Sequence, residues 1–484
     1  MLFTIVALAA ACTGDTGTTT TAGEATGGST DQTTAPDLSG YMPSDDLACV
    51  YLQDVLAVAI ENPEDPASRQ DTIDGATSAL EGLGITGHEA FAAAVLGESD
   101  PENPDAISAL PFDPEDAAEF ESAHSAIDRA LALIVIDADP MLTARALRSE
   151  TRLGIRAAAV HAVGSVGHYK LAPGTNASSF TATLSSVDAV PDDPEFGYVA
   201  VVDSGVAEGA ESPSWLFGPD NLEFSASDVE STATGPSHGT FVAGLIRQVA
   251  PTHAVSLASA RAVDQTDLAT FPFGDTIETP LTTELHVFEA LERLIYRHGS
   301  LDGPVDALNL SLGAYSCDQL DDGTLSLAED DTVLTLSTAL QAWRGSKILA
   351  AAGNENYQYN GLYVKFWPGA LTDVAAIAAS SLAHNEVVWE RDPVTGDREV
   401  AVASGARPWV LASAPGVDLL SIGDGAGGVY SWGGSSFATA VASGMTVSGI
   451  SPGTGYNGAP GLSYVASGVK VTNPRPTSPT TTTP

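Results

Sequence analysis

The chain has 484 residues, of which 44% are apolar, so it can bury a large core and is long enough for about three domains. Its 62 acidic residues outnumber its 19 basic residues and give a net charge of −43. Such a charge repels phosphate groups, which argues against nucleic acid as a partner and against charge-driven docking on anionic lipids.

Residues 1–12 are typical of an export signal. Leu2 to Ala11 are apolar apart from Thr4 and too few to span a bilayer as a helix. Cys12 follows a run of small residues, a pattern that resembles a bacterial lipoprotein signal, in which this cysteine is acylated. We therefore predict an exported chain whose contact with a membrane is a lipid anchor at Cys12. A secreted protein without an anchor and a cytosolic chain with an apolar start are the alternatives.

Two further segments have compositions that oppose folding. Residues 13–40 consist mostly of Thr, Gly, Ser, Ala and Asp, and residues 456–484 are rich in Gly, Pro and Thr. Neither segment can bury enough apolar area to offset the entropy lost on ordering. We predict a disordered tether before the folded part of the chain and a disordered tail after it.

Residues 41–165 are predicted to form a mostly helical N-terminal region. Leu52, Val55, Leu56 and Ala59 are spaced as on one face of a helix. A second helix is predicted to begin at Asp113-Pro114, a capping residue followed by proline. Its buried face would hold Phe120, Ile127, Leu131 and Ile134. This region could be a pro-region, a docking domain or a targeting module.

Four arginines near the end of this region are spaced three or four residues apart. On a helix, Arg145, Arg148, Arg152 and Arg156 would form one stripe. The stripe could be an ordinary solvated face. The more specific hypothesis is that it docks the helical region onto an acidic surface of the domain that follows.

Four segments further along the chain carry groups suited to acyl transfer. The apolar run Tyr198 to Val202 ends in Asp203, and His238 begins a helix of small and apolar residues. The strand-like run Ile348 to Ala352 ends in Gly353-Asn354, and Gly434-Ser435-Ser436 opens another small-residue helix. A serine hydroxyl needs a base to take its proton, and histidine suits this at neutral pH. A buried carboxylate would orient the histidine, and an asparagine amide can bind the oxyanion.

These segments resemble the subtilisin-type serine protease family, which has Asp-(Ser/Thr)-Gly, His-Gly-Thr, Ala-Gly-Asn and Gly-Thr-Ser-Met-Ala in this order. The resemblance implies a three-layer αβα domain with a mainly parallel sheet over residues 166–455. It implies that Asp203 orients His238, the general base, and that Ser436 is the nucleophile and Asn354 part of the oxyanion hole. It also implies that substrate backbone pairs with Ser311, Leu312 and Gly313 and with Ala352 and Gly353. The expected activity is that of a serine endopeptidase acting on polypeptides.

Some positions depart from the family pattern. Ser435 stands where the family has threonine, Phe437 where it has methionine, and Ala440 where it usually has proline. Aligning Ala438 with the family's alanine makes Ser436, not Ser435, the nucleophile. The order Asp, His, Ser excludes an α/β-hydrolase, which runs Ser, Asp, His. The alternative function is a catalytically silent binding module with the same fold.

No cofactor is predicted, and no metal site can be assigned. Members of the family often bind calcium, and residues 318–329 partly resemble a calcium loop. Leu320, however, occupies a position that requires an oxygen ligand. Cys49 and Cys317 could form a disulfide in an oxidising compartment or remain two buried thiols.

Overall fold

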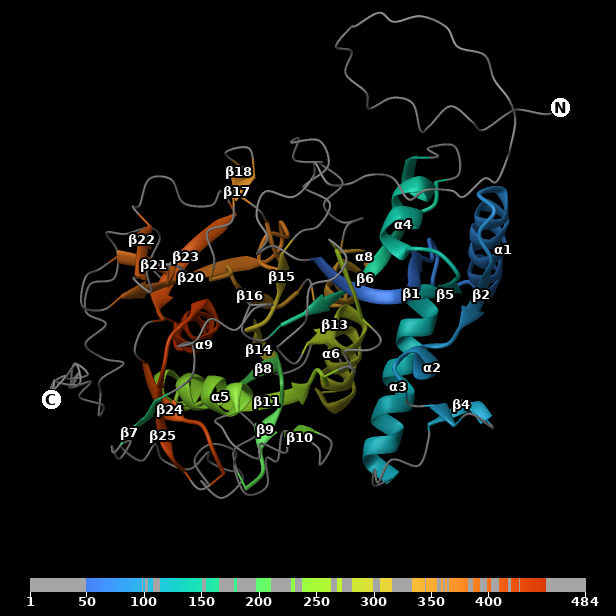
Figure 1. Cartoon of the computed structure of the whole chain (residues 1–484). Helices are drawn as coiled ribbons and strands as arrows, with labels where there is room; N and C mark the ends of the chain where they lie inside the picture. The colour runs from blue at the N-terminus through green and yellow to red at the C-terminus, as the bar shows by residue number, and fades with distance from the viewer. Residues whose placement is uncertain are drawn as a thin grey trace, which may run out of the picture. The chain divides into compact units, whose positions relative to one another are not determined.

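The computed structural model in Figure 1 contains two large sheets and the helices that pack on them. The residues that the structure describes are 49–97, 99–100, 103–107, 114–149, 154–164, 178–180, 197–209, 228–230, 237–262, 268–271, 281–298, 305–315, 333–343, 345–354, 358–359, 362–363, 365–381, 386–391, 398–401, 409–416, 419–425 and 427–449. Cys12, Arg152, Cys317, the predicted tether and tail and the calcium-like loop lie outside them, so those predictions are not tested.

A large sheet forms the centre of the predicted catalytic domain, residues 166–455, which is called the catalytic part below. Its strands lie in the order β11-β8-β14-β16-β20-β21-β22, and β23 also pairs with β20. The pairs from β11 to β20, and the β20–β23 pair, are parallel, whereas β21 and β22 add antiparallel strands. The strands are β8 (Tyr198–Asp203), β11 (Ala254–Ser259), β14 (Val305–Leu310), β16 (Lys347–Ala351), β20 (Ala375–Ser381), β21 (Glu386–Arg391), β22 (Arg398–Ala401) and β23 (Val410–Pro415).

Helices cover both faces of this sheet. On one face, α5 (His238–Val249) and α9 (Ser435–Val447) pack on alternate strand residues such as Val199 and Val201. On the other side lie α6 (Glu284–His298), which contacts β8 and β11, and α8 (Leu334–Gln341), which contacts α6. Strands buried on both faces read as continuous apolar runs, as in the sequence of β8. The predicted three-layer αβα domain with a mainly parallel sheet is therefore confirmed.

The N-terminal region contains a second, antiparallel sheet, so the prediction that it is mostly helical is wrong. Its strand order is β13-β6-β1-β5-β2, with β12 paired to β1. Four of these strands and two helices follow the order β1, α1, β2, β5, α4, β6, which is the ferredoxin-like βαββαβ arrangement. The elements are β1 (Cys49–Ala59), α1 (Pro66–Gly82), β2 (Gly87–Ala90), α2 (Ala92–Val95), β3 (Ser99–Asp100), β4 (Asn103–Ile107), α3 (Pro114–Ala130), β5 (Leu131–Ile136), α4 (Pro140–Ser149) and β6 (Ala157–Val163).

The helical spacing at residues 52–59 has a different cause. Leu52, Val55 and Leu56 lie in β1, which is buried on both faces. Helices α1 and α4 pack on one side of the sheet, while β1 also contacts α8 of the catalytic part. The pairing of β1 with β6 is irregular between Tyr51 and Leu56, so the strand does not alternate. An apolar run of this kind cannot be told from a buried helix by its period alone.

Helix α3 begins at Pro114, as predicted, and buries Phe120 and Ile127. Leu131 and Ile134, predicted to continue its face, lie instead in β5. The predicted single stripe of arginines is also wrong, because α4 ends at Ser149. Arg145 and Arg148 lie on that helix, whereas Arg156 precedes β6.

The two parts of the chain share their smaller sheet. Strand β12 (Leu268–Phe271) pairs with β1, and β13 (Thr282–Thr283) pairs with β6. The remaining short strands are β7 (Ser178–Phe180), β9 (Val206–Ala207), β10 (Val229–Glu230), β15 (Ala314–Tyr315), β17 (Gln358–Tyr359), β18 (Leu362–Tyr363), β19 (Phe366–Trp367), β24 (Leu419–Ile422) and β25 (Val429–Trp432). Within the described residues, no helix has the length and apolar character needed to cross a membrane.

Candidate active site

The carboxyl end of β8 brings Asp203 to the start of α5. Asp203 is fully buried, and its Oδ1 accepts a hydrogen bond from the backbone N–H of Ser204 at 2.8 Å. The Nδ1 atom of His238 lies 2.7 Å from the same Oδ1. A carboxylate can only accept, so Nδ1 carries the proton and Nε2 of the neutral ring is left as the basic nitrogen.

The start of α5 is held against the turn that follows Asp203. Ser237 caps the helix, since its Oγ accepts from the N–H of Thr240 at 3.3 Å. The same Oγ donates to the carbonyl of Gly205 at 2.9 Å. A Cβ on Gly239 would collide with that carbonyl oxygen. The glycine of His-Gly-Thr is thus needed for the close approach that brings His238 to Asp203.

Ser436 lies in the first turn of α9, at its N-terminal end. Its Oγ donates to the carbonyl of Ser311 at 2.9 Å, and the Oγ of Ser311 donates to the carbonyl of Ser436 at 2.8 Å. The ring of Phe437, the next residue, lies 5.0 Å from the imidazole of His238, measured between ring centroids. The two helix starts that carry His238 and Ser436 are therefore neighbours. The Nε2 atom of His238 is buried and has no hydrogen-bond partner among the described residues.

Asn354 follows β16 and lies against the turn before Ser436. Its Oδ1 accepts from the backbone N–H of Ser435 at 2.6 Å. This bond fixes the side chain so that Nδ2 is the donor end of the amide. The Oγ of Ser435 is buried without a partner among the described residues. The structure thus brings together Asp203, His238, Ser436 and Asn354, four residues that the sequence places far apart.

The predicted substrate strand is partly occupied by the chain itself. Gly313 and Gly164, the residue after β6, exchange two backbone hydrogen bonds of 3.0 Å. Ser311 and Leu312, which follow β14, are buried. Ala352 and Gly353 follow β16, and the N–H of Ala352 donates to the carbonyl of Ile377 at 3.0 Å. The end of the N-terminal region therefore lies where a substrate strand was expected.

Two aromatic residues beside His238 complete this site. Trp432 meets the imidazole edge-on with ring centroids 5.5 Å apart, and Phe437 lies on it at a tilt. Phe241 packs against both, with ring centroids 5.6 Å from Trp432 and 4.8 Å from Phe437. Sequence reasoning treated Phe437 only as an apolar replacement and missed Trp432. A tryptophan four residues before the predicted nucleophile was the available signal.

A buried ionic network was also missed by sequence reasoning. Asp228 is buried and pairs with Arg293 and Arg297 of α6. Burial opposes ionisation of this carboxyl, but the two guanidinium groups hold the pKa of Asp228 down at about 2. The signal for this network was a row of charges four residues apart in α6, at Glu289, Arg293 and Arg297.

The described residues include no candidate metal site. Among them, no group of three or more His, Cys, Asp or Glu side chains could hold a metal ion.

The catalytic part of the chain is similar to known proteases. The model of the subtilase family matches residues 197–451, more than half of the chain. Among solved structures, a mutant of the epidermin leader peptide processing serine protease from Staphylococcus aureus is 14% identical, over 81% of this chain and 88% of that chain, with a TM-score of 0.42. The prenylagaramide maturation protease PagA is 20% identical, over 54% of this chain and 80% of that chain, with a TM-score of 0.34. A comparison with curated proteins gave no match.

Proposed function

Because the chain belongs to the subtilase family of serine peptidases, we propose that it is an active endopeptidase that cleaves polypeptides through Asp203, His238 and Ser436. The observation that carries this proposal is the 2.7 Å hydrogen bond between Nδ1 of His238 and Oδ1 of Asp203, beside the helix start that holds Ser436. That bond leaves Nε2 of His238 as the acceptor that a serine nucleophile needs.

In the proposed reaction, Oγ of Ser436 attacks the scissile carbonyl and passes its proton to Nε2 of His238. Ser436 must first turn its hydroxyl away from the carbonyl of Ser311, which it contacts in the resting arrangement. Asp203 stays ionised and stabilises the imidazolium. The proton then goes to the leaving amine, and water hydrolyses the acyl-enzyme by the same route.

The oxyanion of the tetrahedral intermediate would be bound by Nδ2 of Asn354 and the backbone N–H of Ser436. The bond from the N–H of Ser435 to Oδ1 of Asn354 supports this assignment, because it orients the amide before substrate arrives. Donors that are already oriented stabilise developing charge without a cost of reorganisation.

A fluorophosphonate probe tests the proposal, because it labels only an activated serine. The wild-type chain should be labelled, Ser436→Ala should not, and Ser435→Ala should be labelled at a rate close to that of the wild type. If the wild type stays unlabelled before and after self-processing, the chain is a silent binding module and the proposal fails. Labelling of Ser436→Ala but not Ser435→Ala would move the nucleophile by one residue.

We also propose that the N-terminal region is a pro-region that blocks the site until the chain is cut. The support is the pair of hydrogen bonds between Gly164 and Gly313, which places the end of this region on the predicted substrate strand. Cleavage between residues 164 and 198 would release that end. Sequencing the fragments of purified protein tests this: the wild type should be cut in that interval, and Ser436→Ala should remain intact. If the wild type and Ser436→Ala are cut at the same place to the same extent, self-processing is refuted.

Export and acylation at Cys12 remain predictions, since no described residue bears on them.

A further inference from the structure

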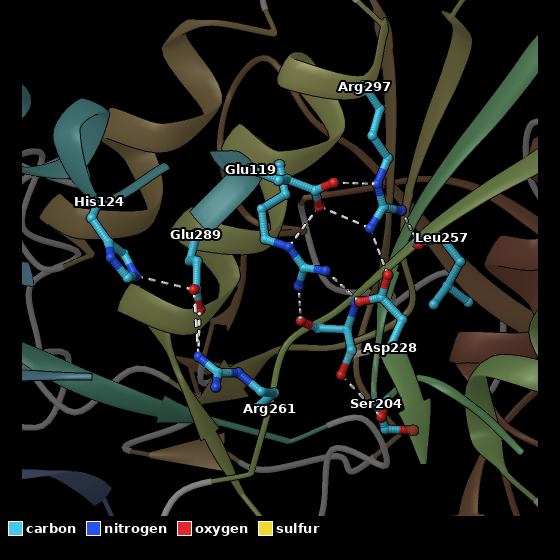
Figure 2. A network of polar contacts seen from close by, with 10 residues as sticks. Glu119, His124, Ser204, Asp228, Leu257, Arg261, Glu289 and Arg297 are labelled. Carbon is cyan, nitrogen blue, oxygen red and sulfur yellow. Dashed lines mark hydrogen bonds and ion pairs between the residues drawn. The ribbon is translucent and has the colours of Figure 1, made fainter. Parts of the chain in front are cut away.

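Helix α3 of the N-terminal region is joined to α6 of the catalytic part by buried charges (Figure 2). Oε1 of Glu119 accepts from Nε of Arg293 at 2.7 Å and from Nη2 of Arg297 at 2.8 Å. Oε2 of Glu119 accepts from Nε of Arg297 at 3.0 Å. Phe120, the next residue of α3, lies under the guanidinium of Arg293, with Cζ 4.1 Å from the ring centroid. These contacts bind α3 to α6 by charge and by cation–π attraction.

The same two arginines hold Asp228 on their other side. Nη2 of Arg293 donates to Oδ1 of Asp228 at 2.8 Å, and Nη2 of Arg297 donates to Oδ2 at 2.6 Å. The side chains of Asp228 and Arg293 are both fully buried, and that of Glu119 is 7% exposed. The arginines therefore form a bridge between a carboxylate of the N-terminal region and a carboxylate of the catalytic part.

Glu119 also supplies negative charge to this network. Arg261, Arg293 and Arg297 pair with carboxylates in this network, and Figure 2 labels Arg261 and Arg297 beside their partners. Two of the carboxylates, Asp228 and Glu289, belong to the catalytic part, and Glu119 supplies the third. Removing the charge of Glu119 would take away one carboxylate partner from Arg293 and from Arg297 in a buried site, which is destabilising.

Asp228 also helps to fix the position of the backbone turn at Asp203. Its Oδ1 accepts from the N–H of Ser259 at 2.7 Å, and Ser259 pairs with Asp203 in the register of β11 and β8. The next N–H, from Ala260, donates to the carbonyl of Asp203 at 2.8 Å. On its other side, Asp228 leads directly into β10, which pairs with β9, three residues after Asp203. A shift of Asp228 would therefore move the Asp203 turn through two backbone connections.

We infer that Glu119 is a positioning residue for Asp203 and that the N-terminal region remains bound as a working part of the enzyme after the chain is cut. This inference rests on the proposed function. Glu119 acts through Arg293, Arg297 and Asp228, and it touches neither substrate nor the reacting atoms. A small displacement of Asp203 from His238 would slow acylation, because catalytic geometry tolerates little error. The N-terminal region would thus block the site at Gly164 and support it at Glu119.

The test compares Glu119→Gln, which removes the charge and keeps the shape, with Glu119→Asp, which keeps the charge. His124→Asn is the matched control, because His124 also joins α3 to α6, by a 3.2 Å contact to Glu289 in the other branch of the network. Each full-length variant is measured well below its melting temperature for its rate of fluorophosphonate labelling and for kcat and KM on a peptide substrate. If Glu119→Gln does not fold, Arg297→Gln is a second variant that weakens the same contact between α3 and α6.

We expect Glu119→Gln and Arg297→Gln to lower the labelling rate and kcat at least tenfold with KM unchanged within twofold. Glu119→Asp should recover most of the rate, and His124→Asn should stay within twofold of the wild type. The N-terminal fragment should also co-elute with the labelled catalytic fragment. Equal slowing in His124→Asn, a wild-type rate in Glu119→Gln, or a separated catalytic fragment with full activity would each overturn the inference.

Hydrogen exchange separates this inference from the proposed function. In a Ser436→Ala background, amides of residues 204–207 should exchange at least tenfold faster in Glu119→Gln than in His124→Asn. This measurement needs no activity, so it decides the positioning role even if the wild type is not labelled. Equal exchange in the two variants would refute that role, whereas an unlabelled wild type by itself refutes only the peptidase proposal.

Discussion

Replacing Glu292 with glutamine should stabilise the protein at alkaline pH and leave its stability nearly unchanged at acid pH. Glu292 lies on α6 and directly precedes Arg293 in the sequence. Burial raises the pKa of this carboxyl to about 7, against the opposing attraction of Arg129. Its pKa in the unfolded chain is the ordinary value of 4.5. Because folding raises the pKa, the protonated carboxyl favours the folded state, and that stability is lost as the pH rises through 7.

The size of the effect follows from these two pKa values. Each unit of pKa difference corresponds to about 1.4 kcal/mol, so keeping Glu292 ionised in the folded protein at pH 8 costs roughly 3 kcal/mol. Partial exposure of the side chain lowers this to about 2 kcal/mol. Glutamine has a similar shape and no charge, so Glu292→Gln should recover about 2 kcal/mol at pH 8 and less than about 1 kcal/mol at pH 5.

The assay is urea unfolding of full-length protein in the Ser436→Ala background, which prevents self-digestion, at pH 5, 6, 7 and 8. Glu81→Gln makes the same chemical change at an exposed position of α1 and is the matched control. Its free energy of unfolding should differ from that of the parent by less than about 0.5 kcal/mol at every pH. If Glu292→Gln gives the same difference at pH 5 as at pH 8, the reasoning from burial is refuted.

Three further predictions concern the site and its surroundings. Asn354→Asp keeps the acceptor for the N–H of Ser435 but loses the amide donor. The kcat should therefore fall by about 10²–10³ with little change in KM. An unchanged kcat would show that Asn354 is not part of the oxyanion hole. Gly239→Ala places a methyl group against the carbonyl of Gly205, so α5 must move and fluorophosphonate labelling of Ser436 should slow at least roughly tenfold. The control is Gly75→Ala on α1, where a Cβ meets open space. In this variant, Ser436 should be labelled at the parent rate. Burial, with help from Arg297, lowers the pKa of His298 to about 4. As the pH drops below 6.5, His298 therefore takes up a proton in the unfolded chain before it does so in the folded protein, and the stability of the folded protein falls. His298→Gln should therefore lose about 1–2 kcal/mol less than its parent between pH 7 and pH 5 in urea unfolding, and an equal loss would show that His298 does not contribute.

The catalytic part of the fold could be predicted well from sequence because its signals are local. The apolar run before Asp203 and the small and apolar residues after His238 and Ser436 each describe one strand end or helix start. The order of these segments resembles that of the subtilisin-type family, and this resemblance implied that they form one site. The N-terminal region was predicted poorly, because β1 is covered on both faces and shows no alternation.

By itself the sequence determined which residue types are available for acyl transfer, their order along the chain, and the αβα class of the domain that holds them. Only the tertiary structure decided which further groups meet: Asn354 with Ser435, Gly164 with Gly313, and Glu119 with Arg293. The physical reason is that these pairs lie tens to hundreds of residues apart, and their energies depend on burial and on partners supplied by other elements. The excess of negative charge along the chain did not reveal that three of its few arginines would pair with buried carboxylates, because charge pairing depends on distance in space.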